Sequence, residues 1–553
     1  MIKKMYSVFI GVFIFLFILF SNCQKNTSFE EGLVGIYFSE PNLTSIKAYS
    51  VLTSLEQVWG QDYEYGIESS GHWNGFIIAP AEGKIRIHVE TNRKIKLSLE
   101  GSDTIVADRD HPVASTEVNM LKGEKYPVDL KFWNDTQLGV FIPSDHVPQS
   151  LDKTDAFFVI KWSWDKQPLS SIPAQYLKHS SSQAALLMHI KEPDPKSINM
   201  KQFLKVHGEH HIVFHEKGRF GGWPANNGIW SWGNEILVAF TKGYFRNKKH
   251  HHSYDQTKQG YSVTARSLDG GETWTLEEPE NFNVYGKKTI PLIKKINFTH
   301  QNFALRNDRD KFIYSYDRGK TWKGPFSFPD FKKGPLTSRT DCLVSNQYTC
   351  LFFLSSKTES VKATLQDRSF CARTTDGGQT IEYLGWMTET DTIRSVMPAT
   401  VRISDTHLIS AMRRRYDPPI TEKPILTKNW IDVYQSLDNG KTWSFLNKIA
   451  KTDTGLRNGN PPSMVRLENG RLCVIYGYRG VPYTIRARVS DDDGKTWSKE
   501  IILRDGARNW DIGYTRSVVR PDQKVVTVYY FTSDDPFENH IVATIWDPME
   551  IDL

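Results

Sequence analysis

Arginine dominates the residues of this chain that can do chemistry. Six arginines lie near the ends of short apolar segments, where a turn or loop begins: Arg219, Arg339, Arg394, Arg413, Arg479 and Arg516. Guanidinium groups stay charged and pair bidentately with carboxylates and sulfates, so a converging set of arginines predicts a site for an acidic ligand. The alternative is that an individual arginine only bridges neighbouring sheets.

A repeated turn provides the framework that must position these side chains. Five segments follow the pattern Ser/Thr-x-Asp-x-Gly-x-Thr-Trp, with isoleucine in place of tryptophan in the third: residues 267–274, 315–322, 374–381, 436–443 and 490–497. Their aspartates are 48, 59, 62 and 54 residues apart, which is the size of a four-stranded propeller blade. Aspartate accepts backbone N–H bonds, glycine takes positive φ and tryptophan packs back onto the blade, so these boxes are structural.

The residues between the boxes predict an all-β, six-bladed propeller. Each unit reads strand, turn, strand, loop, strand, box, and a sixth unit without a box follows, whose outer strand we expect at residues 211–214. Because strand direction alternates, the box turns lie on one face and the starts of the innermost strands lie on the other, here called the mouth. The residues expected at the mouth are Arg219, Asn226, His300, Arg339, Asp341, Arg394, Arg413, Asn460, Arg479, Asp511, Tyr514, Arg516 and Glu538.

The box repeat, the six units and the arginine-lined mouth resemble the sialidase superfamily of glycoside hydrolases, across residues 209–548. The resemblance implies an arginine triad for the sugar carboxylate, a tyrosine nucleophile paired with a glutamate, and an aspartate acid/base. Residues 513–522 resemble the nucleophile strand, which assigns the nucleophile to Tyr514. A neutral tyrosine can approach an anomeric carbon beside a carboxylate without charge repulsion. The alternative for Tyr514 is a tyrosine packed at the propeller axis.

The same resemblance assigns further roles. Asp255, in the first mouth loop, corresponds to the acid/base. Arg413 resembles the second family arginine, Arg479 is the candidate for the third, and Arg219 is the substitute for the first.

Two departures from the family pattern affect these roles. Trp223 and Pro224 stand where the family has Arg-Ile-Pro, so the first arginine is absent from its register. Met397 stands where a glutamate usually begins the fourth blade, so the base of the tyrosine is unassigned, with Asp511 and Glu538 as stand-ins.

These assignments favour a retaining exo-glycosidase that releases terminal sialic acid or a related acidic sugar. A second interpretation is a lyase or hydrolase of a uronate or sulfated polysaccharide, with His300 or His252 as base. A third is a non-catalytic, surface glycan-binding protein. The expected partner is an acidic glycan. No cofactor and no metal are expected, although the histidine run at residues 250–252 could also bind a metal.

An earlier segment, residues 30–178, shows period-two alternation typical of a β-sandwich. Residues 84–89 and 94–99 alternate around a polar turn at residues 91–93, which predicts a hairpin. With residues 72–80 and 162–164, this segment resembles a PA14 domain, which implies a carbohydrate-binding accessory domain. In that family the hairpin commonly carries paired aspartates that bind calcium, whereas Thr91, Asn92 and Arg93 stand here. The alternative is a spacer for the second domain.

The first 22 residues have the layout of a lipoprotein signal peptide. Lys3 and Lys4 precede an apolar run over residues 6–20, and Cys23 follows, where it would become the lipidated first residue of a chain anchored to a bacterial membrane. The alternative is an ordinary cleaved signal. The domains expected are therefore this signal (residues 1–22), the sandwich, a linker (residues 179–205) and the propeller (residues 206–550).

Composition and cysteine content agree with an extracytoplasmic β protein. The 553 residues carry 69 Lys and Arg against 63 Asp and Glu, a net charge of +6 that is too mild to indicate a nucleic-acid partner. The other four cysteines are too sparse for a disulfide scaffold, and we expect either buried thiols or one disulfide between Cys342 and Cys350.

Overall fold

The computed structural model divides the chain into two compact units. It describes residues 29–38, 46–59, 70–100, 104–134, 156–180, 197–248, 252–359, 365–390, 393–416, 427–455 and 458–552. The predicted signal segment and Cys23 lie outside these residues. Within them, no helix is long and apolar enough to cross a membrane.

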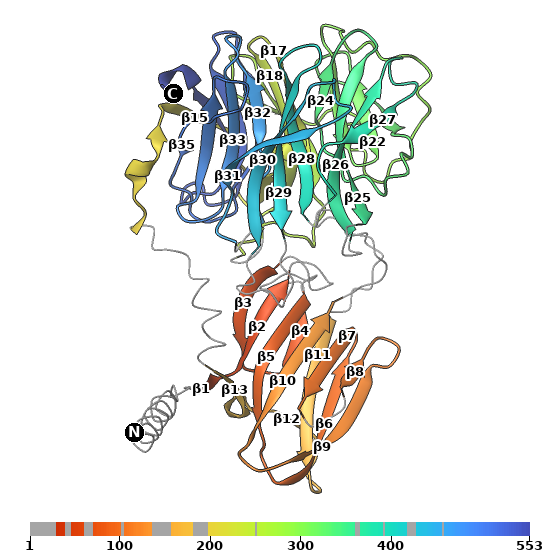
Figure 1. The fold of residues 1–553 in the computed structure, drawn as a ribbon, viewed down its shortest axis with the longest axis vertical. Helices are drawn as coiled ribbons and strands as arrows, with labels where there is room; N and C mark the ends of the chain where they lie inside the picture. The colour runs from red at the N-terminus through yellow and green to blue at the C-terminus, as the bar shows by residue number, and fades with distance from the viewer. Residues whose placement is uncertain are drawn as a thin grey trace, which may run out of the picture. The chain divides into compact units, whose positions relative to one another are not determined.

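The first unit consists of two antiparallel sheets that enclose one core (Figure 1). One sheet has the order β1 (Phe29–Glu31), β13 (Leu177–Ser180), β5 (Ser70–Ile78), β10 (Lys125–Trp133), β7 (Lys94–Leu99) and β8 (Ile105–Ala107), with β2 (Leu33–Phe38) and β3 (Ile46–Leu52) joined to it. The other has the order β12 (Ser170–Ser171), β11 (Ala156–Trp164), β6 (Gly83–Thr91) and β9 (Val113–Met120), with β4 (Glu56–Trp59) beside β11. A 3₁₀ turn, η1 (Ala174–Tyr176), precedes β13.

The alternation expected in this unit is present, but the hairpin prediction was wrong. β6 pairs with β9 and β11, whereas β7 pairs with β8 and β10, so the two strands lie in different sheets. The turn residues bond across the unit instead: the Thr91 hydroxyl donates to the Phe157 carbonyl at 2.7 Å, and Arg93 Nε donates to Asn134 Oδ1 at 3.2 Å. The apolar faces of β6 and β7 therefore enter one core from opposite sides.

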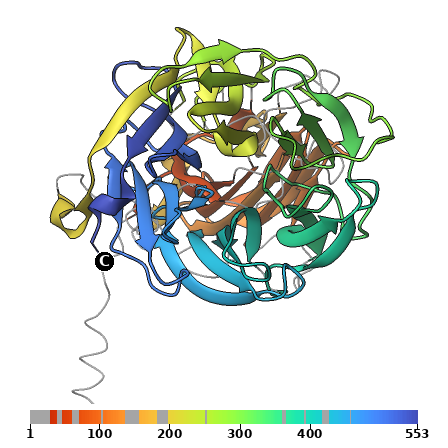
Figure 2. The same ribbon diagram turned by 90° about the horizontal axis from the view of Figure 1, so that it is seen from above.

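The second unit contains six sheets that follow one another around a ring (Figure 2). The first comprises β16 (Arg219–Gly222), β17 (Gly228–Trp232), β18 (Glu235–Tyr244), β19 (Tyr261–Ser267) and β20 (Thr275–Glu277), with η4 (Pro224–Asn226) between β16 and β17. The second has only β21 (Ala304–Asp308), β22 (Lys311–Ser315) and β23 (Lys323–Ser327). The third comprises β24 (Cys342–Val344), β25 (Cys350–Glu359), β26 (Leu365–Thr374) and β27 (Glu382–Trp386).

The remaining three sheets complete the ring. The fourth comprises β28 (Arg394–Arg402), β29 (Leu408–Tyr416), β30 (Lys428–Ser436) and β31 (Ser444–Lys451). The fifth comprises β32 (Ser463–Arg466), β33 (Leu472–Tyr478), β34 (Thr484–Ser490) and β35 (Ile501–Arg504). The sixth comprises β36 (Gly513–Val519), β37 (Val525–Phe531) and β38 (His540–Trp546), and η5 (Pro548–Glu550) follows it.

The chain segment before the first sheet closes this ring. β15 (Gly208–Phe214) pairs antiparallel with β38 and supplies the outer strand of the sixth sheet, so the strand predicted at residues 211–214 is confirmed. β14 (Leu204–Lys205), which follows η3 (Met200–Gln202), pairs in parallel with β35. The second unit therefore begins inside the segment expected to be a linker.

The five boxes form the turns that their sequence predicts. In the fourth, the Ser436 hydroxyl donates to Asp438 at 2.8 Å, and the backbone N–H and hydroxyl of Thr442 donate to the same carboxylate at 2.9 and 2.6 Å. Gly440 has φ +92°, and the Trp443 indole donates to its carbonyl at 3.1 Å. Each box thus satisfies its own polar groups.

The cysteines of the second unit are free thiols. Cys350, Cys371 and Cys473 are buried, and Cys342 is partly exposed. The disulfide considered between Cys342 and Cys350 is not formed.

Candidate functional site

Tyr514 lies at the start of β36, surrounded by arginines. Arg413 Nη1 donates to its hydroxyl at 3.4 Å, and the Arg479 guanidinium lies 5.4 Å from its ring centroid. Burial raises the pKa of the Tyr514 phenol, but the positive charges of Arg413, Arg479 and Arg339 outweigh burial. The pKa therefore lies below its usual value of 10.0, and the phenolate becomes more accessible.

Arg413 is a partly buried cation without a carboxylate partner among the described residues. Its one hydrogen-bond partner there is Tyr514, and its Nε has no acceptor. Burial lowers the pKa of Arg413 and its neighbours Arg394, Arg415 and Arg479 lower it further. Uncompensated buried charge is costly, which is typical of a site built to receive an anion.

The backbone of Tyr514 is held in an unusual conformation. Its φ is +52°, in the left-handed region that side chains other than glycine rarely adopt. Its N–H donates to Asn460 Oδ1 at 2.9 Å, and Asn460 is completely buried. Gly513, with φ +103°, lets the chain approach, because a Cβ there would lie 2.3 Å from the same oxygen.

We expect Gly513→Ala to lower the free energy of unfolding by about 2–4 kcal/mol, because it adds both backbone strain and a clash with buried Asn460. Chemical denaturation measures this cost. Gly506→Ala is the matched control, since Gly506 has φ +77° but open space around its Cβ position, and it should cost only about 1 kcal/mol. Equal losses in the two variants would contradict the close approach to Asn460.

Trp223 and Met397 share the left-handed conformation of Tyr514, with φ of +55° and +56°. They stand where the sequence departs from the family pattern, and both side chains are buried. β28 has a register shift between Val396 and Ala399, and β36 has one between Gly513 and Arg516. Apolar side chains therefore occupy two innermost positions at which the family pattern has an arginine and a glutamate.

Arg479 supports Tyr514 but cannot clamp a substrate as predicted. It is completely buried, its Nε and Nη1 donate to the carbonyls of Ile512 and Asn458 at 3.1 and 3.0 Å, and Nη2 donates to the Tyr530 hydroxyl. These three acceptors, together with its complete burial, hold Arg479 in place behind Tyr514.

Asp511 continues the network behind Tyr514. Its carboxylate accepts hydrogen bonds from the Tyr530 hydroxyl at 2.7 Å and from the Ser253 N–H at 3.0 Å, and His252 Nδ1 lies 2.5 Å from it. Burial raises the pKa of Asp511, but His252 and Arg479 lower it below the usual value. The contact between Asp511 and Tyr514 is therefore indirect. Asp511 is hydrogen-bonded to Tyr530, whose ring centroid is 6.1 Å from that of Tyr514.

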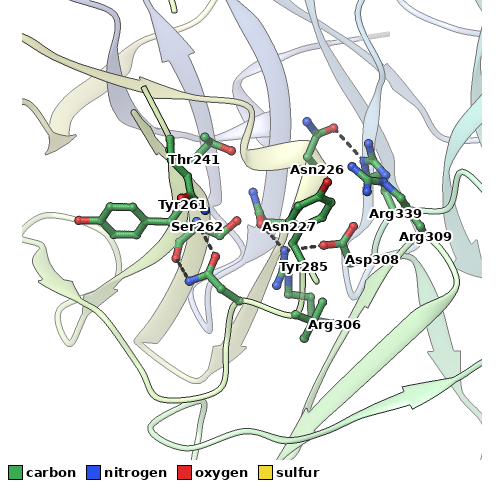
Figure 3. Close-up of a pocket in the computed structure, with 14 residues that line it drawn as sticks. Asn226, Asn227, Thr241, Tyr261, Ser262, Tyr285, Arg306, Asp308, Arg309 and Arg339 are labelled. Carbon is green, nitrogen blue, oxygen red and sulfur yellow. Dashed lines mark hydrogen bonds and ion pairs between the residues drawn. The ribbon is translucent and has the colours of Figure 1, made fainter. Parts of the chain in front are cut away.

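Arg339 and Asn226 adjoin Tyr514 from the other side of the mouth. Arg339 Nε donates to Asn226 Oδ1 at 3.2 Å (Figure 3), and its charge contributes to the lowered pKa of Tyr514. The structure therefore brings together six of the residues expected at the mouth: Tyr514, Arg413, Arg479, Asn460, Arg339 and Asn226.

Asp341 and Arg516 lie within electrostatic reach of each other, close to these residues. The Thr400 hydroxyl donates to Asp341 Oδ2 at 3.0 Å, and Arg516 Nη2 donates to the Ala225 carbonyl at 2.7 Å. Burial raises the pKa of Asp341 to about 7, although Arg516 and Thr400 act to lower it. A carboxyl group with such a pKa can both give and take a proton near neutral pH.

Several predicted residues are engaged elsewhere. Arg394 forms an ion pair with Asp367 at 2.6 Å, as the bridging alternative expects. The His300 ring packs on Tyr316, within the second box, with centroids 4.6 Å apart, so the prediction that His300 lies at the mouth was wrong.

Three others have partners outside the Tyr514 group. The Arg219 guanidinium lies 4.0 Å from the Tyr244 ring centroid. Asp255 Oδ1 accepts from the Thr257 N–H at 3.1 Å and lies 4.0 Å from Arg246. Glu538 pairs with His215 at 3.1 Å and accepts from the Gly218 N–H at 2.9 Å, so it does not touch Tyr514 as a base would.

Sequence reasoning missed Tyr530 and Gly513 as parts of the site. Tyr530 belongs to an apolar strand, and nothing in such a run distinguishes a hydroxyl that links Arg479 to Asp511. Gly513 had a usable signal, since a glycine before the nucleophile strand indicates positive φ or a close approach.

Comparisons with known proteins agree with the repeated boxes. Residues 284–527 match the model of the BNR repeat-like domain, a region that includes the second to fifth boxes. A search of curated proteins gives no match.

Three of the solved structures that this chain resembles are the following. A protein of unknown function from Dyadobacter fermentans has a TM-score of 0.47 at 19% identity, covering 61% of this chain and 98% of that chain. An alpha-L-arabinanase from Penicillium chrysogenum, complexed with arabinobiose, has a TM-score of 0.42 at 13% identity, covering 62% and 99%. A mutant of NanB sialidase from Streptococcus pneumoniae has a TM-score of 0.39 at 10% identity, covering 87% and 99%.

Proposed function

We propose that the second unit is a six-bladed propeller of the sialidase type and that the protein is a retaining exo-glycosidase, which releases terminal sialic acid or a related acidic sugar from glycans. The observation that carries this proposal is the Tyr514 phenol, whose pKa is lowered beside Arg413, a partly buried cation without a carboxylate partner among the described residues. Such a pair combines a nucleophile with a receptor for the acidic group of the sugar.

In this proposal Arg413 and Arg339 receive the sugar carboxylate, and Tyr514, ionised to its phenolate beside these arginines, attacks the anomeric carbon. The bond to the leaving oxygen breaks as a carboxylic acid donates its proton to that oxygen. In the second step the resulting carboxylate takes a proton from water, the water oxygen attacks the anomeric carbon, and the Tyr514 phenolate leaves.

Asp341 is the proposed acid/base, because its pKa of about 7 makes both protonation states available near neutral pH. Asp255, the residue that the family resemblance assigns, is the alternative for this step. Comparing Asp341→Asn with Asp255→Asn distinguishes the two, since a good leaving group such as an activated phenol needs little acid assistance and should rescue only the true acid variant.

A panel of substrates tests the proposal. We expect release of a free acidic monosaccharide from fluorogenic sialosides or natural sialylated glycans, detected by mass. Products only from uronate or sulfated polysaccharides, with an unsaturated product absorbing in the ultraviolet, would instead favour a lyase. Silence on every acidic glycan would overturn the glycosidase proposal.

A glycan-binding function is the second candidate. The buried side chains of Trp223 and Met397 at positions where the family pattern has an arginine and a glutamate favour it, because a mouth without those groups can still bind an acidic sugar. Binding of acidic glycans without turnover would support this candidate.

The first unit and the anchor complete the proposal. We propose a PA14-like, carbohydrate-binding role for the sandwich and lipidation at Cys23, with the enzyme attached to a bacterial membrane. Mass analysis of the mature protein tests the lipid, and loss of membrane association in Cys23→Ala is the expected result.

A further inference from the structure

A solvent-open pocket lies between the first and second sheets of the second unit, next to the Tyr514 group. Its cavity volume is about 110 Å³, and its wall includes η4, β18, β19 and β21 (Figure 3). Arg339 and Asn226 belong both to this wall and to the surroundings of Tyr514. A chain of sugars whose end is bound at Tyr514 can therefore continue into the pocket.

Three arginines give the pocket its positive charge. Arg306, Arg309 and Arg339 line it, against one lining carboxylate, Asp308, which lies 3.4 Å from Arg306 Nη2. Burial lowers the pKa of Arg306, and the charges of Arg339 and Arg309 lower it further, so the three guanidinium groups are close enough to repel one another. An arriving anion would relieve that repulsion.

Arg306 and Arg309 retain binding capacity. Arg306 is 4% exposed, and although its Nη1 and Nη2 donate to the Phe282 carbonyl and to Asn227 Oδ1, its Nε has no acceptor. The Arg309 side chain has no ion pair or hydrogen bond with any described residue; its guanidinium lies 5.6 Å from the Tyr285 ring centroid. Such groups fit sulfate or carboxylate oxygens.

An aromatic side chain supplies a surface for a sugar ring. Tyr285 lines the pocket and is 45% exposed, whereas the ring of Tyr261 points away from the arginines (Figure 3). The Asn283 side chain, which also lines the pocket, is fixed by two hydrogen bonds with the backbone of Ser262, at 2.8 and 2.9 Å. Amphipathic aromatic rings beside fixed polar groups are typical of carbohydrate subsites.

We propose that this pocket is a leaving-group subsite for a sugar that carries a sulfate or a carboxylate, with Arg309 and Arg339 on the anion and Tyr285 against the ring. The position relative to the cleaved bond rests on the proposed function; the binding of an anionic sugar does not. The substrate would then be acidic at the released sugar and at the sugar that follows it.

Binding measurements in the full chain carrying Tyr514→Phe test this proposal without turnover. Calorimetry with lactose 3′-sulfate, digalacturonate and lactose should show at least one anionic disaccharide binding ten times or more as tightly as lactose. Which anion binds decides between sulfate and carboxylate. Added Arg309→Gln should reduce this preference about tenfold, and added Tyr285→Ala should weaken all binding.

Lys495→Gln is the control, because it removes one exposed positive charge within the fifth box and should leave binding unchanged. Equal affinity for lactose and both anions, or a preference that survives Arg309→Gln, would overturn the subsite. Anion-selective binding by a wild-type protein that hydrolyses no acidic glycan would refute the glycosidase and leave the subsite established. Hydrolysis of an acidic glycan without the Arg309-dependent preference would refute the subsite and leave the glycosidase established.

Discussion

Tyr514→Phe is expected to reduce kcat/KM on an acidic glycoside by at least about 1,000-fold, because it removes the proposed nucleophile while keeping ring size and packing. The left-handed backbone conformation at residue 514 does not depend on the tyrosine hydroxyl, so we expect the variant to fold. Circular dichroism and steady-state kinetics on the same preparation separate these effects. A loss of less than tenfold would sink the nucleophile assignment.

Tyr314→Phe is the matched control, since Tyr314 is also a buried tyrosine but lies on β22, in the second sheet. It should leave kcat/KM within about twofold of wild type. Ultraviolet titration gives a second readout that a purely structural role would not produce. Wild type should contain a phenol that ionises below the usual value of 10.0, as the lowered pKa of Tyr514 requires, and Tyr514→Phe should lose it.

The sequence could predict the boxes because their interactions are local. Ser436, Asp438 and Thr442 bond to one another within seven residues, and that pattern specifies the same turn wherever it occurs. The strand that closes the ring could also be predicted. The sixth unit lacked an outer strand, and residues 211–214 had a strand-like pattern that no other unit used. Alternation in residues 84–99 predicted which side chains are buried, but not that β6 and β7 pair in different sheets, because pairing depends on distant strands.

The contacts within the site were harder to predict from the sequence, because they also depend on distant segments. Tyr514 and Arg413 could be predicted from their positions at strand ends. No pattern in the sequence around Arg479 indicates that its guanidinium donates hydrogen bonds to carbonyls of two other segments. The left-handed conformations at Trp223 and Met397 run against the preferences of those residues, and only the surrounding ring imposes them.

Asp341→Asn is expected to stabilise the protein at pH 8 while abolishing most of its activity. Since burial raises the pKa of Asp341 to about 7, the folded state holds this proton between about pH 4 and 7, where the unfolded state has released it. Wild-type stability from this group is therefore complete below pH 4 and is lost as pH rises through 7. A shift of about three pH units corresponds to roughly 2–4 kcal/mol after solvent screening of a partly exposed group.

Asparagine removes this loss because it stays neutral and its amide oxygen can still accept from the Thr400 hydroxyl. The difference in unfolding free energy between Asp341→Asn and wild type should thus become more favourable to the variant by roughly 2–4 kcal/mol between pH 4 and pH 8. Urea denaturation at the two pH values measures it. A difference that does not change with pH would show that Asp341 ionises in the fold as it does in the unfolded chain.

Activity gives the complementary result. If Asp341 is the acid/base, Asp341→Asn should lower kcat/KM on a natural glycan by about 100-fold or more, with a much smaller loss on a fluorogenic phenol glycoside. Asp255→Asn should then show neither the large loss nor the dependence on leaving group. The opposite pattern in the two variants would move the acid/base to Asp255 and leave Asp341 as a buried carboxyl whose proton only stabilises the fold. A functional carboxyl that is kept away from water costs folding free energy, because its charged form is poorly solvated there. Replacing it should therefore raise the free energy of unfolding and abolish catalysis at the same time.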